Sequence, residues 1–445
     1  MTKDLLKLAE TALSRAKHFG ATAADALVID GHSLEIGVRE GSIENLEQSE
    51  ACEIGLRVLV GQSSAAIATS KIDAAGIERI AEQAVAMAKA APADPYAGIA
   101  AANEIAKDWA PLDIAGDALP DATRLRDMAL TAEASALKVK GVSKSGGAGA
   151  SSSDRTILLA ASNGFAGSYR RTGVSLSATA IAGEGTLMER DYDYSSVIHL
   201  EDLRKAEDIG HEAGLRAARR LGARKVKSQA VPVIYDNRIA ASLVGHFLSA
   251  IMGSAIARGT SFLRDRLGSQ LFAKGIEILD DPRRPRGLAS RPFDAEGIAT
   301  RPLSLIEDGV LKSWILDLGS ARQLGLKTTG HAARGLAGPP GPSSSNVHLK
   351  PGEASLADMM KAIGEGFYVT ELIGHGPNIV TGDYSRGASG YWIENGEIAY
   401  PVSEVTLAGK LADIFAKLVP ANDLTFRTAI NAPSCLIEGM TLGGR

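Results

Sequence analysis

The sequence predicts an α+β protein, in which an N-terminal and a central α/β unit pack on a larger, strand-rich C-terminal domain with a buried helix. A chain of 445 residues is longer than one ordinary domain. Amphipathic helix patterns alternate with short strand patterns up to about residue 226, and strand patterns then dominate around one apolar helix. These observations divide the chain into residues 1–110, 111–226 and 227–445.

The N-terminal unit begins with a predicted helix over residues 3–19, which ends at Gly20. A second helix is predicted over residues 74–91, with apolar residues at the spacing of one face. Between them, residues alternate in character as they do in half-buried strands, with a hairpin turn at Glu40-Gly41-Ser42. The predicted strands are residues 25–29, 34–39, 43–47, 53–60 and 64–69.

The central unit follows a connector rich in Ala, Asp and Pro, residues 92–120. Helices are predicted over residues 122–138 and 201–221, and the arginines near the end of the second suit a helix C-terminus and a surface linker. Two or three antiparallel strands are predicted within residues 156–190, turning at Asn163-Gly164.

The C-terminal domain opens with a predicted strand, residues 231–236, and a long apolar helix from Asn237 with Asp236 as its N-cap. Hairpin turns are predicted at Asp308-Gly309 and Asn395-Gly396, because both dipeptides accept positive φ angles. Residues 334–346, rich in Gly, Pro and Ser, are predicted to be a mobile loop.

Composition excludes several classes of function. The net charge is −4, so no overall field attracts nucleic acid or anionic lipid. No segment has the apolar length of a membrane span or the pattern of a signal peptide. The two cysteines, Cys52 and Cys435, form no CxxC pair, which favours buried free thiols and a cytoplasmic location.

The densest group of polar side chains and glycines lies between residues 371 and 405. His375 stands between two glycines, and the candidate cleft residues Asp383, Tyr384, Ser385 and Arg386 follow shortly after it. Because no GxSxG elbow is present, contact with a substrate is favoured over nucleophilic catalysis. His246 lies on the apolar helix, where a lone histidine is usually a hydrogen-bonded core residue.

Together these stretches resemble the TldD/PmbA family, and within it the PmbA (TldE-like) branch, over nearly the whole chain. The resemblance rests on VTELIGHG at residues 369–376, TGDYSRGASGYWIENG at 381–396 and PVSEVT at 401–406. It implies a cytoplasmic, zinc-dependent peptidase system built from two related subunits. In the TldD branch, a helix carries a His-Glu-x-x-x-His motif, whose histidines bind zinc and whose glutamate acts as general base.

This chain departs from the pattern that the resemblance implies. Ala241 stands where the first histidine is expected, Ser242 where the glutamate is expected, and only His246 remains. The TldD branch also has a cysteine near its C-terminus, and Cys435 lies slightly beyond the matching position. The resemblance therefore implies no zinc in this chain and a zinc ion in its partner.

The main hypothesis is a non-catalytic subunit that completes the peptide cleft of a TldD-like partner in a heterodimer, with a homodimer as the form without that partner. One alternative is a stand-alone peptidase with a metal-free site around His375 and Asp383. Another is an interaction protein, with the DNA gyrase modulator role that is attached to the family's name. We expect neither nucleic acid nor membrane as a partner.

Overall fold

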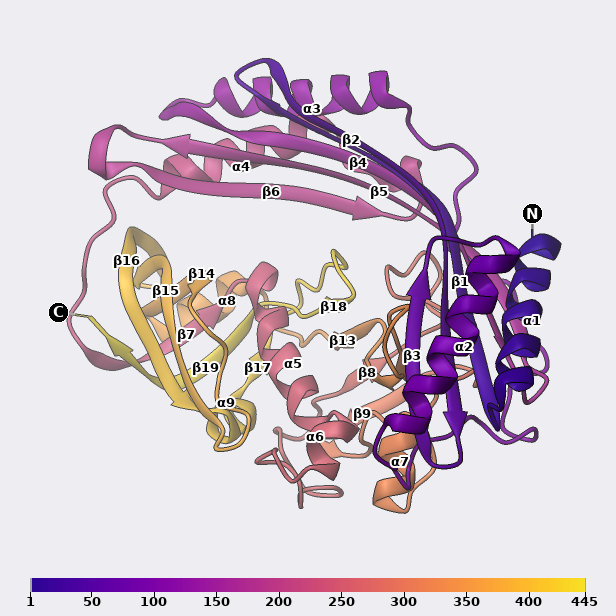
Figure 1. Cartoon of the computed structure of the whole chain (residues 1–445). Coiled ribbons are helices and arrows are strands. Elements are labelled where there is room, and N and C mark those ends of the chain that lie inside the picture. The colour runs from indigo at the N-terminus through magenta and orange to yellow at the C-terminus, as the bar shows by residue number, and fades with distance from the viewer. Residues whose placement is uncertain (1, 445) are drawn as a thin grey trace.

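The first half of the chain forms one continuous sheet rather than two separate ones. The computed structural model describes residues 2–444. Six antiparallel strands occur in the order β3-β2-β1-β4-β5-β6, and helices cover one face of the sheet (Figure 1). These elements are α1 (Thr2–Phe19), β1 (Ala23–Arg39), β2 (Ser42–Val60), β3 (Ser63–Thr69), α2 (Ala74–Ala90), α3 (Ala122–Leu137), β4 (Val142–Ala161), β5 (Ala166–Ala182), β6 (Glu189–Val197) and α4 (Ala206–Arg219).

Strand β1 explains how the two predicted α/β units share this sheet. Its even-numbered residues all point to one face, because side chains alternate along a strand. Ala24 and Val28 pack with α1 and α2, whereas Ile36 and Val38 pack with α3 and α4. The odd-numbered Leu27 faces the other way, into a small aromatic cluster that includes residues of the C-terminal domain.

The C-terminal domain contains a small barrel. Its strands occur in the order β16-β15-β14-β7-β19-β17, and pairing of β16 with β19 closes the ring. Helix α5 lies between this barrel and a second sheet, in the order β10-β9-β8-β13-β18 (Figure 1). The barrel elements are β7 (Gln229–Tyr235), β14 (Gly366–Ile373), β15 (Asp383–Glu394), β16 (Glu397–Lys410), β17 (Val419–Pro420) and β19 (Cys435–Gly443), with α8 (Leu356–Ile363) and α9 (Leu411–Lys417) beside them.

The remaining elements of this domain are shorter. They are α5 (Asn237–Ile251), α6 (Gly253–Ala257), β8 (Ile278–Asp280), β9 (Leu303–Glu307), β10 (Val310–Leu311), α7 (Leu318–Leu324), β11 (Ala332–Ala333), β12 (Gly341–Pro342), β13 (Val347–Leu349) and β18 (Ile430–Asn431). Helix α5 is buried along one side by Leu243, Phe247 and Ile251. The predicted buried helix, the α+β class and the hairpins at residues 308–309 and 395–396 are confirmed.

The loop at residues 334–346 differs from the prediction of a mobile segment. The side chain of Arg334 is fully buried and forms an ion pair with Asp25 of β1, which also binds Arg57. Residues 341–342 form β12 and pair with β11. A buried ion pair between residues 309 positions apart therefore fixes this loop on the first sheet. The prediction of a mobile segment was based on local composition, which carries no information about such a distant partner.

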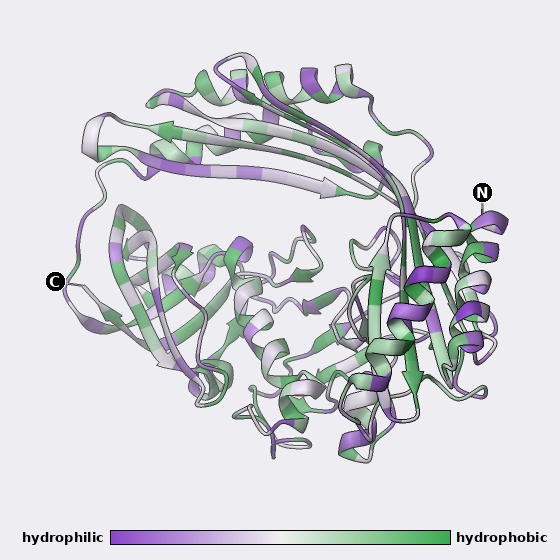
Figure 2. Cartoon of the chain, in the orientation of Figure 1, coloured by the Kyte–Doolittle hydropathy of each residue, from purple (hydrophilic) through white to green (hydrophobic). Residues whose placement is uncertain are grey.

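The first sheet extends over the C-terminal domain, and its edge strand β6 faces the barrel and α5 (Figure 1). Much of β6 is hydrophilic, whereas the barrel contains long hydrophobic stretches (Figure 2). Within residues 2–444, no helix is long and apolar enough to cross a membrane. The hydrophilic strand β6 therefore lies at the boundary between the first sheet and the C-terminal domain.

Candidate functional site

Helix α5 carries Ala241, Ser242 and His246, the residues that the resemblance aligns with a zinc motif. The helix begins directly after the central barrel strand β7, and the Asp236 carboxylate caps it by accepting a hydrogen bond from the Arg238 backbone N–H at 2.9 Å. Asp236 also accepts a hydrogen bond from the Tyr368 hydroxyl of β14. Ser242 and His246 are one turn apart and therefore lie on the same side of α5.

These positions hold two buried polar atoms that lack partners. Ser242 Oγ and His246 Nε2 are inaccessible to solvent and form no hydrogen bond with any part of the chain that the structure describes. Burial, and secondarily the positive charge of Arg386, lowers the pKa of His246 to about 4. The imidazole is therefore neutral at neutral pH. Ala241 contributes only a methyl group.

Strand β15 divides the predicted cleft residues between two faces. Tyr384 is buried, with its ring 5.9 Å from that of His246 and its hydroxyl bonded to Tyr235 at 3.1 Å. Arg386, two residues later, points to the same side and lies close enough to affect the charge of His246. The structure thus brings Tyr384 and Arg386 to the α5 site.

The other predicted cleft residues lie elsewhere. Asp383 is exposed and pairs with Lys410 at 2.5 Å and with the Thr381 hydroxyl, while Ser385 is exposed on the same face of β15. His375 is exposed in the loop between β14 and β15. These three side chains form no Ser-His-Asp hydrogen-bond chain among themselves in the described part of the protein.

A cavity of about 370 Å³ opens beside Ser242 and Arg386. Residues of β6, β14 and β15 line it together with the end of α4 and the start of α5. The charged groups in its wall are Arg190, Asp191, Arg220, Arg238, Glu371 and Arg386. A neighbouring cavity of about 570 Å³ shares Asp191 and Arg238 with it, and a third of about 490 Å³ shares Arg216 with the second. We call these three adjoining spaces the interdomain cleft.

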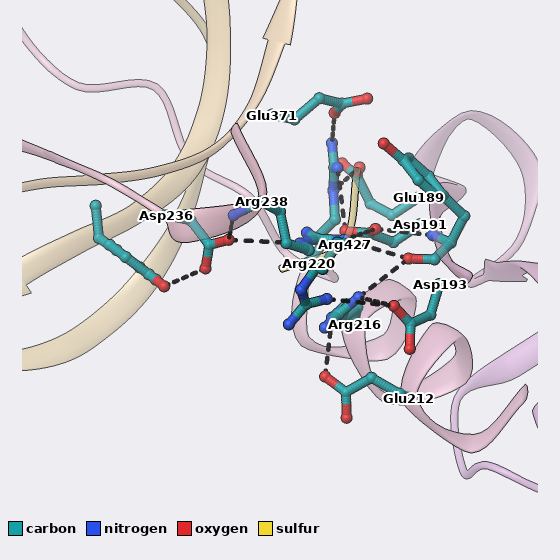
Figure 3. A network of polar contacts seen from close by, with 12 residues as sticks. Glu189, Asp191, Asp193, Glu212, Arg216, Arg220, Asp236, Arg238, Glu371 and Arg427 are labelled. Carbon is teal, nitrogen blue, oxygen red and sulfur yellow. Dashed lines mark hydrogen bonds and ion pairs between the residues drawn. The ribbon is translucent and has the colours of Figure 1, made fainter. Parts of the chain in front are cut away.

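Ion pairs cross the cleft and join β6, the edge strand of the first sheet, to the C-terminal domain (Figure 3). Arg220 Nη2 lies 2.6 Å from Glu371 Oε2 of β14, and its Nε lies 3.2 Å from Glu189 Oε2 of β6. Arg238 of α5 lies 3.3 Å from Asp191. This network holds the polar edge of the first sheet against the barrel.

Sequence reasoning missed this network. Arg220 was predicted only as part of the basic end of a helix that leads into a surface linker, but its side chain is only 11% exposed and forms ion pairs. The sequence does contain a pattern that could have indicated this network. Glu189, Asp191 and Asp193 occupy every second position of one strand, so their carboxylates point to the same side. Three carboxylates on one face of a strand need cations, and Arg216, Arg220 and Arg238 supply them.

The side chains around α5 do not fit a zinc ion. Zinc needs about three nitrogen, sulfur or carboxylate donors, and this helix face offers one imidazole. No group of three His, Cys, Asp or Glu side chains within residues 2–444 has the arrangement of a metal site. The Cys435 thiol is fully buried and donates to the Pro433 carbonyl at 3.2 Å, and burial raises its pKa well above the usual value. The charge of Arg386 also disfavours a cation beside His246.

Comparison with known proteins identifies the family. Three family models match in order: PmbA/TldA metallopeptidase domain 1 at residues 24–88, the central domain at 117–221 and the C-terminal domain at 228–444. The chain belongs to the PmbA/TldD family. The metalloprotease PmbA of Escherichia coli O157:H7 is 35% identical over 99% of this chain and 97% of its own length. A PmbA homologue of Haemophilus influenzae is 33% identical over 99% and 98%.

Solved structures have the same fold. A protein of Bacteroides thetaiotaomicron, described as a candidate modulator of DNA gyrase, superposes with a TM-score of 0.91 at 27% identity, covering 99% of this chain and 98% of its own. TldE of Thermococcus kodakarensis superposes with a TM-score of 0.88 at 19% identity, covering 98% and 99%. The predicted family is thus confirmed over the whole chain.

Proposed function

We propose that this chain is a non-catalytic subunit of a cytoplasmic zinc peptidase, whose TldD-like partner carries the metal and hydrolyses the peptide bond. One observation supports this most strongly. The α5 face at the family's motif positions presents a methyl group, a hydroxyl and one neutral imidazole, namely Ala241, Ser242 and His246. Neither the methyl group nor the hydroxyl can replace the glutamate as general base, and one imidazole is too few ligands for zinc.

The interdomain cleft supports a role in binding peptide. Strand β6 is the edge strand of its sheet, and its residues 190–197 contribute to the walls of all three cavities. An extended peptide can add to such an edge through main-chain hydrogen bonds, which suits unfolded or small peptides of varied sequence. The Tyr192 carbonyl already accepts hydrogen bonds from Arg216 and Arg238, so peptide pairing is expected beyond it, near Tyr194 and Ser196.

The partner is expected to be a related subunit. Two chains of the same fold pair readily about a pseudo-two-fold axis, which brings equivalent elements to one shared cavity. The heterodimer is the proposed active form, and a homodimer is the proposed form without the partner.

A reconstitution experiment tests this function. This chain and a TldD-like subunit are purified separately and together, and hydrolysis of an unstructured peptide is measured for each sample. We expect hydrolysis by the mixture and none by this chain. A partner whose activity is the same with and without this chain would refute the proposed role. Replacing Tyr194 and Ser196 by proline tests the contribution of the β6 edge, since proline removes main-chain donors.

A second candidate function is binding to DNA gyrase, which is favoured by the descriptions of the structurally similar Bacteroides and Thermotoga proteins. Such a role would operate through protein contact, since the net charge of −4 provides no general attraction for DNA. Binding to purified gyrase, with no effect of a TldD-like subunit, would support it over the peptidase role.

A further inference from the structure

Ser242 and Arg386 line the cavity of about 370 Å³, and His246 lies one helical turn from Ser242 on the same side of α5. Ser242 Oγ and His246 Nε2 come from α5, and Arg386 Nε comes from β15. None has a hydrogen-bond partner within the described residues. Folded proteins pair nearly all such groups, so these three atoms have hydrogen-bonding capacity that a ligand in the cavity could use.

The charge of the cavity wall indicates the sign of that ligand. Four arginines and two carboxylates line it, which leaves two positive charges in excess. Arg220 and Arg238 are both within ion-pair distance of Asp191. By contrast, Arg386 and Arg190 have no carboxylate partner within residues 2–444, and the hydrogen bond of the Arg386 side chain goes to the Gly374 carbonyl at 3.3 Å.

The available groups also indicate the chemistry. A guanidinium can only donate hydrogen bonds, and a serine hydroxyl and a neutral imidazole can each donate one. A carboxylate accepts up to four and matches the planar fork of arginine. A cavity of about 370 Å³ is large enough for a carboxylate together with the residue that bears it.

We propose that Ser242, His246 and Arg386, at the end of the interdomain cleft, bind a carboxylate group of the peptide, in the first place its C-terminal carboxylate. That the ligand is a peptide rests on the proposed function above. Holding the chain end here would fix how far a substrate extends along β6, and so which bond reaches the partner's catalytic site. An Asp or Glu side chain is the other source of the same group.

Binding of matched peptides to the isolated full-length chain tests the proposal. N-acetyl-trialanine with a free C-terminal carboxylate is compared by calorimetric titration with the same peptide as a C-terminal amide. We expect the acid to bind about tenfold more tightly or better, as expected for a charge-assisted hydrogen-bonded pair. Arg386→Gln should bring the ratio close to one, and Ser242→Ala should lower it. Arg264→Gln, which alters an exposed arginine paired with Asp265, should leave it unchanged.

A third peptide separates the two sources of carboxylate. An amidated peptide that ends in glutamate and binds as tightly as the free acid would support the pocket and assign it to side chains. Equal binding of acid and amide by the wild-type chain, no measurable binding of either, or a ratio unchanged by Arg386→Gln would overturn the proposal. Melting temperatures show that the variants are folded.

This binding experiment and the reconstitution with a partner can fail separately, since binding is measured without a partner and without hydrolysis. If the chain prefers the free acid but the mixture with the partner hydrolyses no peptide, the carboxylate pocket is supported and the peptidase role is refuted. If the mixture hydrolyses peptide but the chain does not prefer the acid, the peptidase role is supported and the pocket is refuted.

Discussion

Replacing Arg220 by methionine tests whether the ion-pair network holds the first sheet against the C-terminal domain. The Arg220 side chain is 11% exposed and contacts Glu371 of β14 and Glu189 of β6. Methionine keeps much of the aliphatic volume but removes the cation. Asp191 would still have Arg238, whereas Glu371 has no other cation at ion-pair distance among the residues described.

The expected loss of stability follows from burial. Removing one member of a fully buried pair costs about 3–5 kcal/mol, and an exposed pair contributes about 0–1 kcal/mol. Because Glu371 is 26% exposed, we expect a value between these, about 2–3 kcal/mol. For a domain of about 200 residues this lowers the melting temperature by roughly 4–12 °C.

Scanning calorimetry measures this change directly. Arg264→Met is the matched control, because it replaces an exposed arginine that pairs with its neighbour Asp265, and it should melt like the wild type. A wild-type melting temperature for Arg220→Met would show that the network contributes nothing to the contact between domains. Arg220→Lys should fall between the two, since lysine keeps the charge but cannot bridge several carboxylates at once.

Three further predictions concern other parts of the structure. The pKa of His246, lowered to about 4 in the folded chain, lies below its unfolded value of about 6.5, so the unfolded chain binds more protons between these values. Stability should therefore fall by up to about 3 kcal/mol as pH drops from 6.5 to 4, and His246→Gln should remove this part of the slope in urea unfolding at several pH values. Gly55→Ala would place the new Cβ 2.0 Å from the Leu336 carbonyl oxygen, and we expect it to lower the free energy of unfolding in urea by about 1–3 kcal/mol. Gly149→Ala is the control and should be tolerated, because its Cβ would lie 3.7 Å from the nearest atom. Equal stability of the two variants would refute the close packing of the loop at residues 334–346 against β2. Iodoacetamide should leave Cys435 unmodified in the folded chain but not in urea, as mass spectrometry would show, and rapid modification of the folded chain would contradict its burial.

Local signals in the sequence predicted the features that local physics determines. The turn at Glu40-Gly41 needs positive φ at both residues, and φ is 52° and 75° there. Asp236 caps α5 as predicted, and Asn395-Gly396 turns the hairpin between β15 and β16. In each case the dipeptide or the cap residue carries its own structural preference.

Features that depend on distant partners were not predictable in this way. The central strands were expected to start near residue 156, but β4 begins at Val142 in a run of small and polar residues. That segment is a strand because it pairs with β1 over more than 100 positions of sequence, as Val38 with Ala148 shows. The same limit applies to the candidate site, where Arg386 of β15 and Ser242 of α5 line one cavity although they are far apart in the sequence.

Zinc content measured together with peptidase activity in the purified chain tests the central claim most directly. The account predicts much less than one zinc ion per chain after dialysis against zinc-containing buffer, and no peptide hydrolysis above the blank. One zinc ion per chain, with hydrolysis that is lost on chelation and restored by zinc, would contradict it.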